Sequence, residues 1–135
     1  MKRITKILIL ILLIITAVSA SVAGFLFIID PSGSLIGLSV EYINNSPFDS
    51  FLIPGIVLLV ANGVLNFFAA IYLFLNKINS EFIVIIQGVI LCGWIIIQVM
   101  MVSEINILHI TMFTIGVLLI LGGLILKKNL RIIKS

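Results

Sequence analysis

The sequence has few charged residues, one cysteine and one histidine. Only 10% of its 135 residues are charged and 62% are hydrophobic, whereas a soluble domain of this size needs far more polar surface. The single cysteine, Cys92, lies within an apolar run, so neither an internal disulfide nor a CxxC redox pair can form. We interpret Cys92 as a small buried packing residue.

Ionisable residues are absent from the centres of the apolar runs, which argues against proton relays and ion-coupled transport. No His, Cys or carboxylate cluster has metal-ligand spacing, and no Ser/His/Asp grouping can be assembled. One histidine cannot supply paired haem ligands, although His109 with a methionine remains conceivable. We therefore predict no enzymatic activity, no metal site and no cofactor.

What the sequence does contain is long apolar blocks, each at or above the length that spans a bilayer. They cover residues 7–29, 51–75, 82–102 and 107–126. The fold class expected for residues 1–135 is all-α: a single integral membrane domain, an antiparallel up-down four-helix bundle. The basic start resembles a signal peptide, but its apolar run continues to residue 29, so we expect an uncleaved first helix.

The positions of lysine and arginine predict how this bundle is oriented. All eight lie near the amino terminus, in the 76–81 link or in the carboxyl-terminal tail, and the 30–50 loop has none. The positive-inside rule then places both termini in the cytoplasm and the 30–50 loop, with a short segment at 34–45, outside. The basic termini are expected to meet anionic lipid of the inner leaflet, and nucleic-acid binding is not expected.

The start of the second span allows two interpretations. Ser46 followed by Pro47 and Asp49 is typical of a helix N-terminus, and Pro54 would then kink the helix. In the alternative, the helix is capped at Ser50 and Pro54 lies within its first turn.

Intramembrane amides are the first candidate site. The set comprises Asn62, Asn66, Gln87 and Gln98, with Trp94 one turn before Gln98. The first interpretation is that they hydrogen-bond between helices and fix the register of the bundle, with Asn66 and Gln87 facing each other at matching depth. The alternative is a polar-lined pocket with Trp94 as a wall.

The outer ends of the helices supply a second candidate, formed by Asp49, Glu104 and His109 with the 30–50 loop as a lid. The competing interpretation is ordinary solvated charge at loops and helix ends.

Three short motifs resemble those of a known group of proteins. They are Ser46-Pro47-Phe48 through Phe51-Leu52-Ile53-Pro54-Gly55, Asn62-Gly63, and Gly93-Trp94-Ile95 with Gln98. The chain resembles an uncharacterised family of small prokaryotic four-helix membrane proteins with an SPFxxFLIPG-like entry to the second helix. The likeness runs from about Pro31 to Gln98 and implies a multi-pass protein of the prokaryotic cytoplasmic (inner) membrane. A weaker similarity, in helix number alone, is to DoxX-like proteins.

Two functions remain open. Small residues at 17/21 and 20/24 permit close helix approach, which favours an accessory or assembly subunit held by helix packing, with a homo-oligomer or a membrane-protein partner. The alternative is a binder or carrier of a small apolar ligand, a lipid or a quinone, in the bundle interior.

Overall fold

The structure is a computed structural model that describes residues 2–36, 47–102 and 107–134. Within these ranges the chain is built from helices and contains no strand, which confirms the predicted all-α four-helix bundle. The elements are α1 (Lys2–Ile29), η1 (Ser34–Ile36), α2 (Leu52–Val57), η3 (Leu58–Val64), α3 (Leu65–Phe74), α4 (Ser80–Val102) and α5 (Ile107–Lys134).

Four helical stretches among the described residues are long and apolar enough to cross a membrane. They are Arg3–Ile29, Leu52–Phe74, Ser80–Met100 and Ile107–Lys128. The second joins α2, η3 and α3 in one continuous span, because the residues at both junctions keep right-handed helical dihedrals. The chain is therefore a small multi-pass membrane protein.

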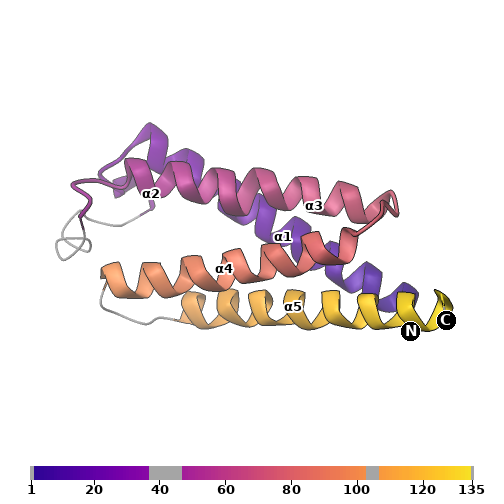
Figure 1. Cartoon of the computed structure of the whole chain (residues 1–135). Helices are drawn as coiled ribbons and strands as arrows, with labels where there is room; N and C mark the ends of the chain where they lie inside the picture. Colours follow the sequence, from indigo (N-terminus) through magenta and orange to yellow (C-terminus); the bar gives the residue numbers. More distant parts are fainter. Residues whose placement is uncertain (1, 37–46, 103–106, 135) are drawn as a thin grey trace.

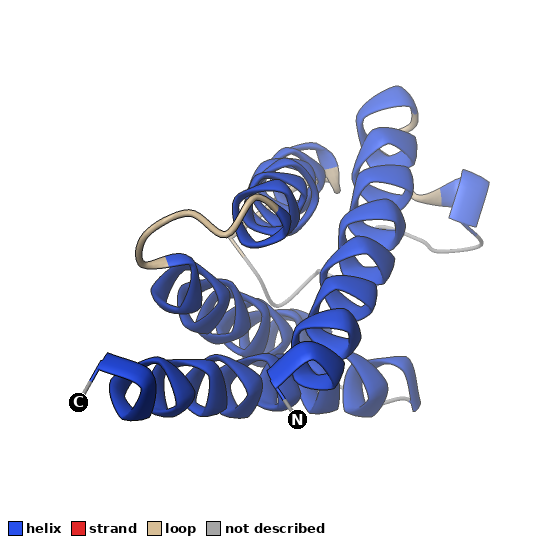
Figure 2. Cartoon of the chain, turned by 90° about the vertical axis from the view of Figure 1, so that its right-hand side faces the viewer, coloured by secondary structure: helices blue, strands red, loops and turns tan. Residues whose placement is uncertain are grey.

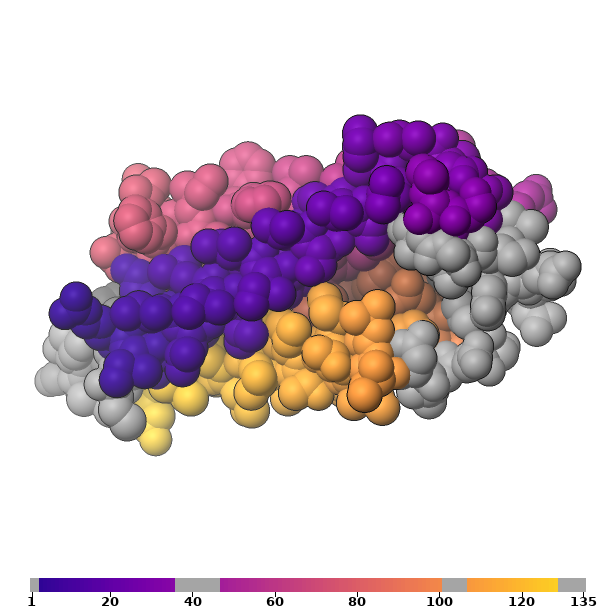
Figure 3. Space-filling view, turned by 180° about the vertical axis from the view of Figure 1, so that it is seen from behind, coloured from indigo at the N-terminus to yellow at the C-terminus, as the bar shows by residue number. Residues whose placement is uncertain are grey.

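Successive spans run in opposite directions, so the start of α1 and the end of α5 lie at the same end of the bundle (Figure 1). We call this the terminal end. Viewed from there, α1 is inclined to α5, meets it near the start of α1 and then diverges (Figure 2). Ile9 of α1 packs on Gly122 of α5 at this crossing. From behind, α1 lies across the bundle between α3 and α5 (Figure 3) and so forms one wall of the interior.

At the opposite end, hydrogen bonds and ring stacking fix where the second span begins. The Phe51 N–H donates to the Pro31 carbonyl at 2.8 Å, and the Phe27 and Phe51 rings stack with centroids 4.8 Å apart. Because α2 begins at Leu52, Pro54 lies in its first turn, as the second alternative predicted, but the N-cap is Phe51 and not Ser50.

The other helix start proposed from the sequence is wrong. Pro47 and Asp49 precede the helix instead of opening it, and Ser46 lies outside the described residues. The Leu52 N–H donates to the Ser50 hydroxyl at 3.3 Å, so Ser50 provides a side-chain partner near the helix start. Most of the segment predicted at 34–45 also falls outside the described residues, apart from η1.

The link between α3 and α4 is a tight turn made by asparagines with positive φ. Asn76 has φ 56° and Asn79 has φ 65°, values that asparagine tolerates better than most residues. The Lys77 N–H donates to the Tyr72 carbonyl at 3.2 Å, which closes the end of α3 in the manner of a left-handed C-cap. The turn is joined to α1 by a 2.5 Å hydrogen bond from Lys6 Nζ to Asn76 Oδ1.

Glycines allow the helices to approach closely at two seams. Between α1 and the second span, a Cβ built on Gly24 would lie 2.8 Å from the Gly55 carbonyl oxygen, and one on Gly63 would lie 2.6 Å from Ser21 Oγ. Between α4 and α5, a Cβ on Gly88 would lie 2.7 Å from the Gly116 carbonyl oxygen. The close approach predicted for the small residues of the first span is confirmed at Ser21 and Gly24.

Candidate functional site

A polar-lined cavity of about 120 Å³ lies in the bundle interior, and all four spans contribute to its walls. It lies toward the end of the bundle away from the chain termini, because its α5 residues come from the first two turns of that helix. Apolar side chains make most of the wall. The polar and aromatic-polar residues that line it are Thr16, Ser19, Asn62, Trp94, Gln98 and His109.

Asn62 is the most unusual of these side chains. It is fully buried, and neither its Oδ1 nor its Nδ2 has a hydrogen-bond partner among the described residues. A buried polar group without a partner costs about 1–3 kcal/mol. A stable bundle therefore carries this residue at a cost, which calls for a function or for a partner that binds there.

The backbone around Asn62 explains its position. Residues Leu58–Val64 form a π-helix, in which the Leu65 N–H donates to the Val60 carbonyl five residues back. The wider turn changes the angular spacing of side chains along the span, and such insertions are frequent at functional sites. Asn66 follows one turn later, where its Nδ2 donates to the Asn62 backbone carbonyl at 2.7 Å.

Thr16 and Trp94 add further polar atoms without partners to the same walls. Thr16 is fully buried and Trp94 is 8% exposed, and Thr16 Oγ1 and Trp94 Nε1 have no hydrogen-bond partner within the described chain. Their helices, α1 and α4, reach the cavity from different sides. Together with Asn62 they offer an amide, a hydroxyl and an indole N–H, which suits a molecule with both acceptor and donor groups.

The intramembrane set predicted from the sequence divides in two. Asn62, Trp94 and Gln98 line the cavity, as the pocket interpretation requires, whereas Asn66 and Gln87 are buried and do not line it. Asn66 Oδ1 and Gln87 Oε1 both lack a hydrogen-bond partner in the described part of the chain. The direct hydrogen bond that matching depths suggested between these amides is therefore not formed.

The outer-face candidate is not brought together in the described structure. Asp49 is exposed in the segment before α2, and Glu104 lies outside the described residues. His109 is only 7% exposed and faces the bundle interior, where it lines the cavity. Counting residues from the helix end placed His109 at the interface but could not show which way it pointed.

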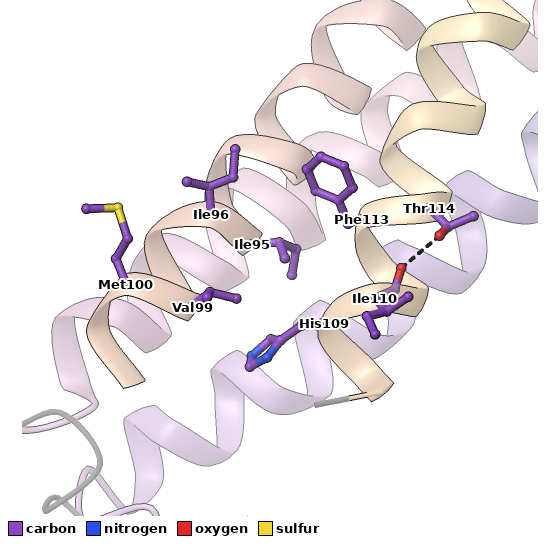
Figure 4. A pocket seen from close by; sticks show the side chains of 8 residues that line it. All are labelled: Ile95, Ile96, Val99, Met100, His109, Ile110, Phe113 and Thr114. Atoms are coloured by element: carbon purple, nitrogen blue, oxygen red, sulfur yellow. Dashed lines mark hydrogen bonds between the residues drawn. The ribbon is translucent and has the colours of Figure 1, made fainter. Parts of the chain in front are cut away.

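A second hollow, an open groove of about 330 Å³, lies between the carboxyl-terminal part of α4 and the amino-terminal part of α5. Figure 4 shows Ile95, Val99 and Met100 on α4 across from His109 and Phe113 on α5. The Thr114 hydroxyl donates to the Ile110 carbonyl at 2.8 Å, as the dashed line shows, so the groove surface is almost entirely apolar.

The chemistry that this site offers is hydrogen bonding, and His109 is the only titratable side chain among its lining residues. No Asp, Glu, Lys or Arg is among the residues that line the cavity or the groove. Within the described residues, no group of three or more His, Cys, Asp or Glu side chains is placed to hold a metal ion. Sequence reasoning missed Thr16 and Ser19. The available signal was their position in the first span, where they are two of the few hydroxyls in an aliphatic run.

Comparison with known proteins adds no family to this description, since no protein-family model, no curated protein and no solved structure matches the chain.

Proposed function

We propose that this membrane protein is a non-catalytic binder of a small amphiphilic molecule, held in the cavity between its four spans. The observation that carries the proposal is Asn62, a fully buried amide on the cavity wall whose two polar atoms have no partner within the described chain. A ligand that hydrogen-bonds this amide would recover the free energy that its burial costs.

The positions of the other buried polar groups that lack hydrogen-bond partners support the same function. Thr16 and Trp94 come from different helices, line one cavity and carry buried polar atoms without partners within the described chain. A few convergent polar groups in an otherwise apolar pocket are the usual composition of a small-molecule site. If these groups only held the helices in register, we would expect them to bond to one another across the interface.

The assembly role predicted first from the sequence loses its main support. The small residues that motivated it, Ser21 and Gly24 on α1, pack against the second span of the same chain. The same holds for Gly88 and Gly116, which pack against each other. These close-approach surfaces are occupied within the chain, so they are not available to a partner subunit.

The proposed setting is the cytoplasmic membrane of a prokaryote, with both termini in the cytoplasm. All eight lysines and arginines belong to segments at the terminal end, namely the start of α1, the link between α3 and α4 and the end of α5, which supports this orientation and contact with anionic inner-leaflet lipid. Cysteines introduced by Ser34→Cys and Asn129→Cys test it: an impermeant thiol reagent added to intact cells should label the first only.

Binding is tested by mass spectrometry of the protein extracted in mild detergent. The wild-type chain should retain a small-molecule adduct that Asn62→Leu loses, because leucine offers no hydrogen bond and intrudes on the cavity. Val60→Leu is the matched control: Val60 belongs to the same π-helix but is 49% exposed on the outside of the bundle.

An adduct that survives Asn62→Leu unchanged would contradict the proposal, as would a wild-type protein with no adduct. A stoichiometric protein partner in place of a small molecule would instead favour the assembly role.

A further inference from the structure

The polar cavity and the apolar groove meet at shared residues. Ile95 of α4 and His109 of α5 line both hollows, so the two volumes lie next to each other at these side chains. Figure 4 shows the His109 ring projecting from the first turns of α5 into the space beside Val99. A molecule that passed from the cavity to the lipid between α4 and α5 would therefore cross at these two side chains.

The two hollows differ in polarity as the two parts of an amphiphile do. The cavity is lined by Thr16, Asn62 and Trp94, which carry buried hydrogen-bonding atoms without partners within the described chain. The groove presents Ile96, Val99 and Met100 on its α4 side. A polar head group finds hydrogen-bond partners only in the cavity. A hydrocarbon chain loses no apolar contact when it moves from lipid into the groove.

Charge limits what the head group can be. No Asp, Glu, Lys or Arg lines either hollow, and His109 is the only titratable side chain there, so a phosphate or ammonium head would meet no permanently charged partner. Burying an unpaired charge costs far more than burying a hydrogen-bonded neutral group. Phospholipid heads are therefore disfavoured at this site.

Volume limits the head as well. About 120 Å³ corresponds to roughly four water molecules of liquid volume. A carbonyl or hydroxyl group on a small ring or a glycerol unit is of this order.

Resting on the binding function proposed above, we propose that the ligand is a neutral amphiphile. Its uncharged, oxygen-bearing head occupies the cavity against Asn62 and Trp94, and its hydrocarbon chain leaves past Ile95 and His109 through the α4–α5 groove. Isoprenoid-type quinones and neutral glycerides both have this chemistry.

The hydrocarbon chain of the ligand adds little affinity, because the surrounding lipid is as apolar as the groove. The groove is important because it provides space for the hydrocarbon chain, which does not fit in the cavity together with the head group. Obstructing the groove should therefore weaken binding of chained ligands and spare chainless ones.

Trp94, the only tryptophan of the chain, gives a direct signal from the cavity wall. Its fluorescence would be titrated in nanodiscs with a benzoquinone carrying a decyl chain and with the same benzoquinone without the chain. Dibrominated diacylglycerol and dibrominated phosphatidylglycerol, as quenchers of tryptophan, separate the glyceride source from a charged phospholipid.

Val99→Phe obstructs the groove, and Ile97→Phe is the matched control: Ile97 is 50% exposed and lines neither hollow. We expect wild type and Ile97→Phe to be quenched saturably by both benzoquinones. Val99→Phe should lose about tenfold in affinity for the decyl compound, equivalent to about 1.4 kcal/mol, and keep its affinity for the chainless one. Ile96→Phe, at an exposed groove position, replaces Val99→Phe if that variant does not fold.

Saturable quenching by the diacylglycerol with none by the benzoquinones supports the neutral head and assigns the glyceride source. Saturable quenching by the benzoquinones with none by the diacylglycerol assigns the quinone source. Equal quenching by phosphatidylglycerol overturns the neutral head, and equal effects of Val99→Phe and Ile97→Phe overturn the chain exit. If no neutral probe quenches while the Asn62-dependent adduct persists, this inference fails and the binding function stands; without that adduct, the binding function itself fails.

Discussion

The seam between α4 and α5 and the centre of the bundle are packed by opposite means. At the seam, Gly88 and Gly116 bring two backbones so close that a single added carbon would lie 2.7 Å from a carbonyl oxygen. At the centre, larger polar side chains from all four spans leave a cavity of about 120 Å³ between them. The helices are in tight contact where the chain has glycines. They leave open volume where Asn62 and Gln98 line the interior.

This difference indicates which positions serve stability and which serve binding. Helices in lipid gain little from the hydrophobic effect and associate mainly through close van der Waals contact, which glycine seams provide. Buried amides without hydrogen-bond partners instead lower the stability of the bundle, since each costs free energy unless another group bonds to it. We expect substitutions in the two regions to change stability in opposite directions.

The largest effect is expected from Gly88→Ala at the α4–α5 seam. The new Cβ would meet backbone atoms, the Gly116 carbonyl oxygen at 2.7 Å and the Ile120 nitrogen at 3.0 Å, which cannot move without separating the helices. We expect a loss of about 2 kcal/mol in the free energy of unfolding, measured by detergent denaturation and far-ultraviolet circular dichroism.

Gly93→Ala is the matched control on the same helix. A Cβ at Gly93 has no neighbour within 4 Å. It should be neutral or stabilise by up to about 1 kcal/mol through helix propensity. Equal losses for both glycine variants would contradict the seam as the source of stability.

A smaller effect of opposite sign is expected from Asn62→Leu in the ligand-free protein. The substitution removes two buried polar atoms that lack partners and fills part of the cavity. Unfolding should become harder by about 1–2 kcal/mol, although ligand binding is lost. Such an exchange of stability for binding is common at functional sites.

The measurement is detergent unfolding of delipidated protein, with Val60→Leu as the lipid-facing control. If Asn62→Leu is instead as destabilising as Gly88→Ala, the Asn62 amide is held by bonds essential to the fold, and the cavity is a structural feature.

Hydropathy and charge placement were sufficient to predict the fold, because a bilayer requires long apolar helices and these dominate the sequence. The pocket alternative named Asn62, Trp94 and Gln98, which line the cavity, together with Asn66 and Gln87, which do not. These residues could be found because polar groups in apolar runs are rare enough to stand out.

The rest of the site depended on geometry that residue spacing does not carry. Asn66 lies one turn beyond Asn62 along the second span, where its side chain donates to the Asn62 carbonyl and does not line the cavity. The inclination of α1 brings Thr16 to the cavity, and the orientation of His109 depends on how α5 packs beside α4. These features arise from contacts among helices distant in sequence.

The smallest effect is expected for the coupling between Asn66 and Gln87, measured in a double-mutant cycle with leucine at each position. Matching depth in the sequence suggested a shared hydrogen bond and a coupling of about 0.5–1.5 kcal/mol. The structure forms no direct bond between them, since Asn66 Oδ1 and Gln87 Oε1 have no partner among the described residues and Asn66 Nδ2 donates to the Asn62 carbonyl.

Residues that share no bond should behave independently, so we expect the double variant to equal the sum of the single variants within about 0.5 kcal/mol. Detergent unfolding of the four proteins, followed by Trp94 fluorescence, gives the coupling directly. A coupling above about 1 kcal/mol would mean that the two amides communicate through a bridging molecule. In that case the polar interior would extend past the cavity toward the terminal end, and the contrast between a tightly packed seam and a single open centre would have to be redrawn.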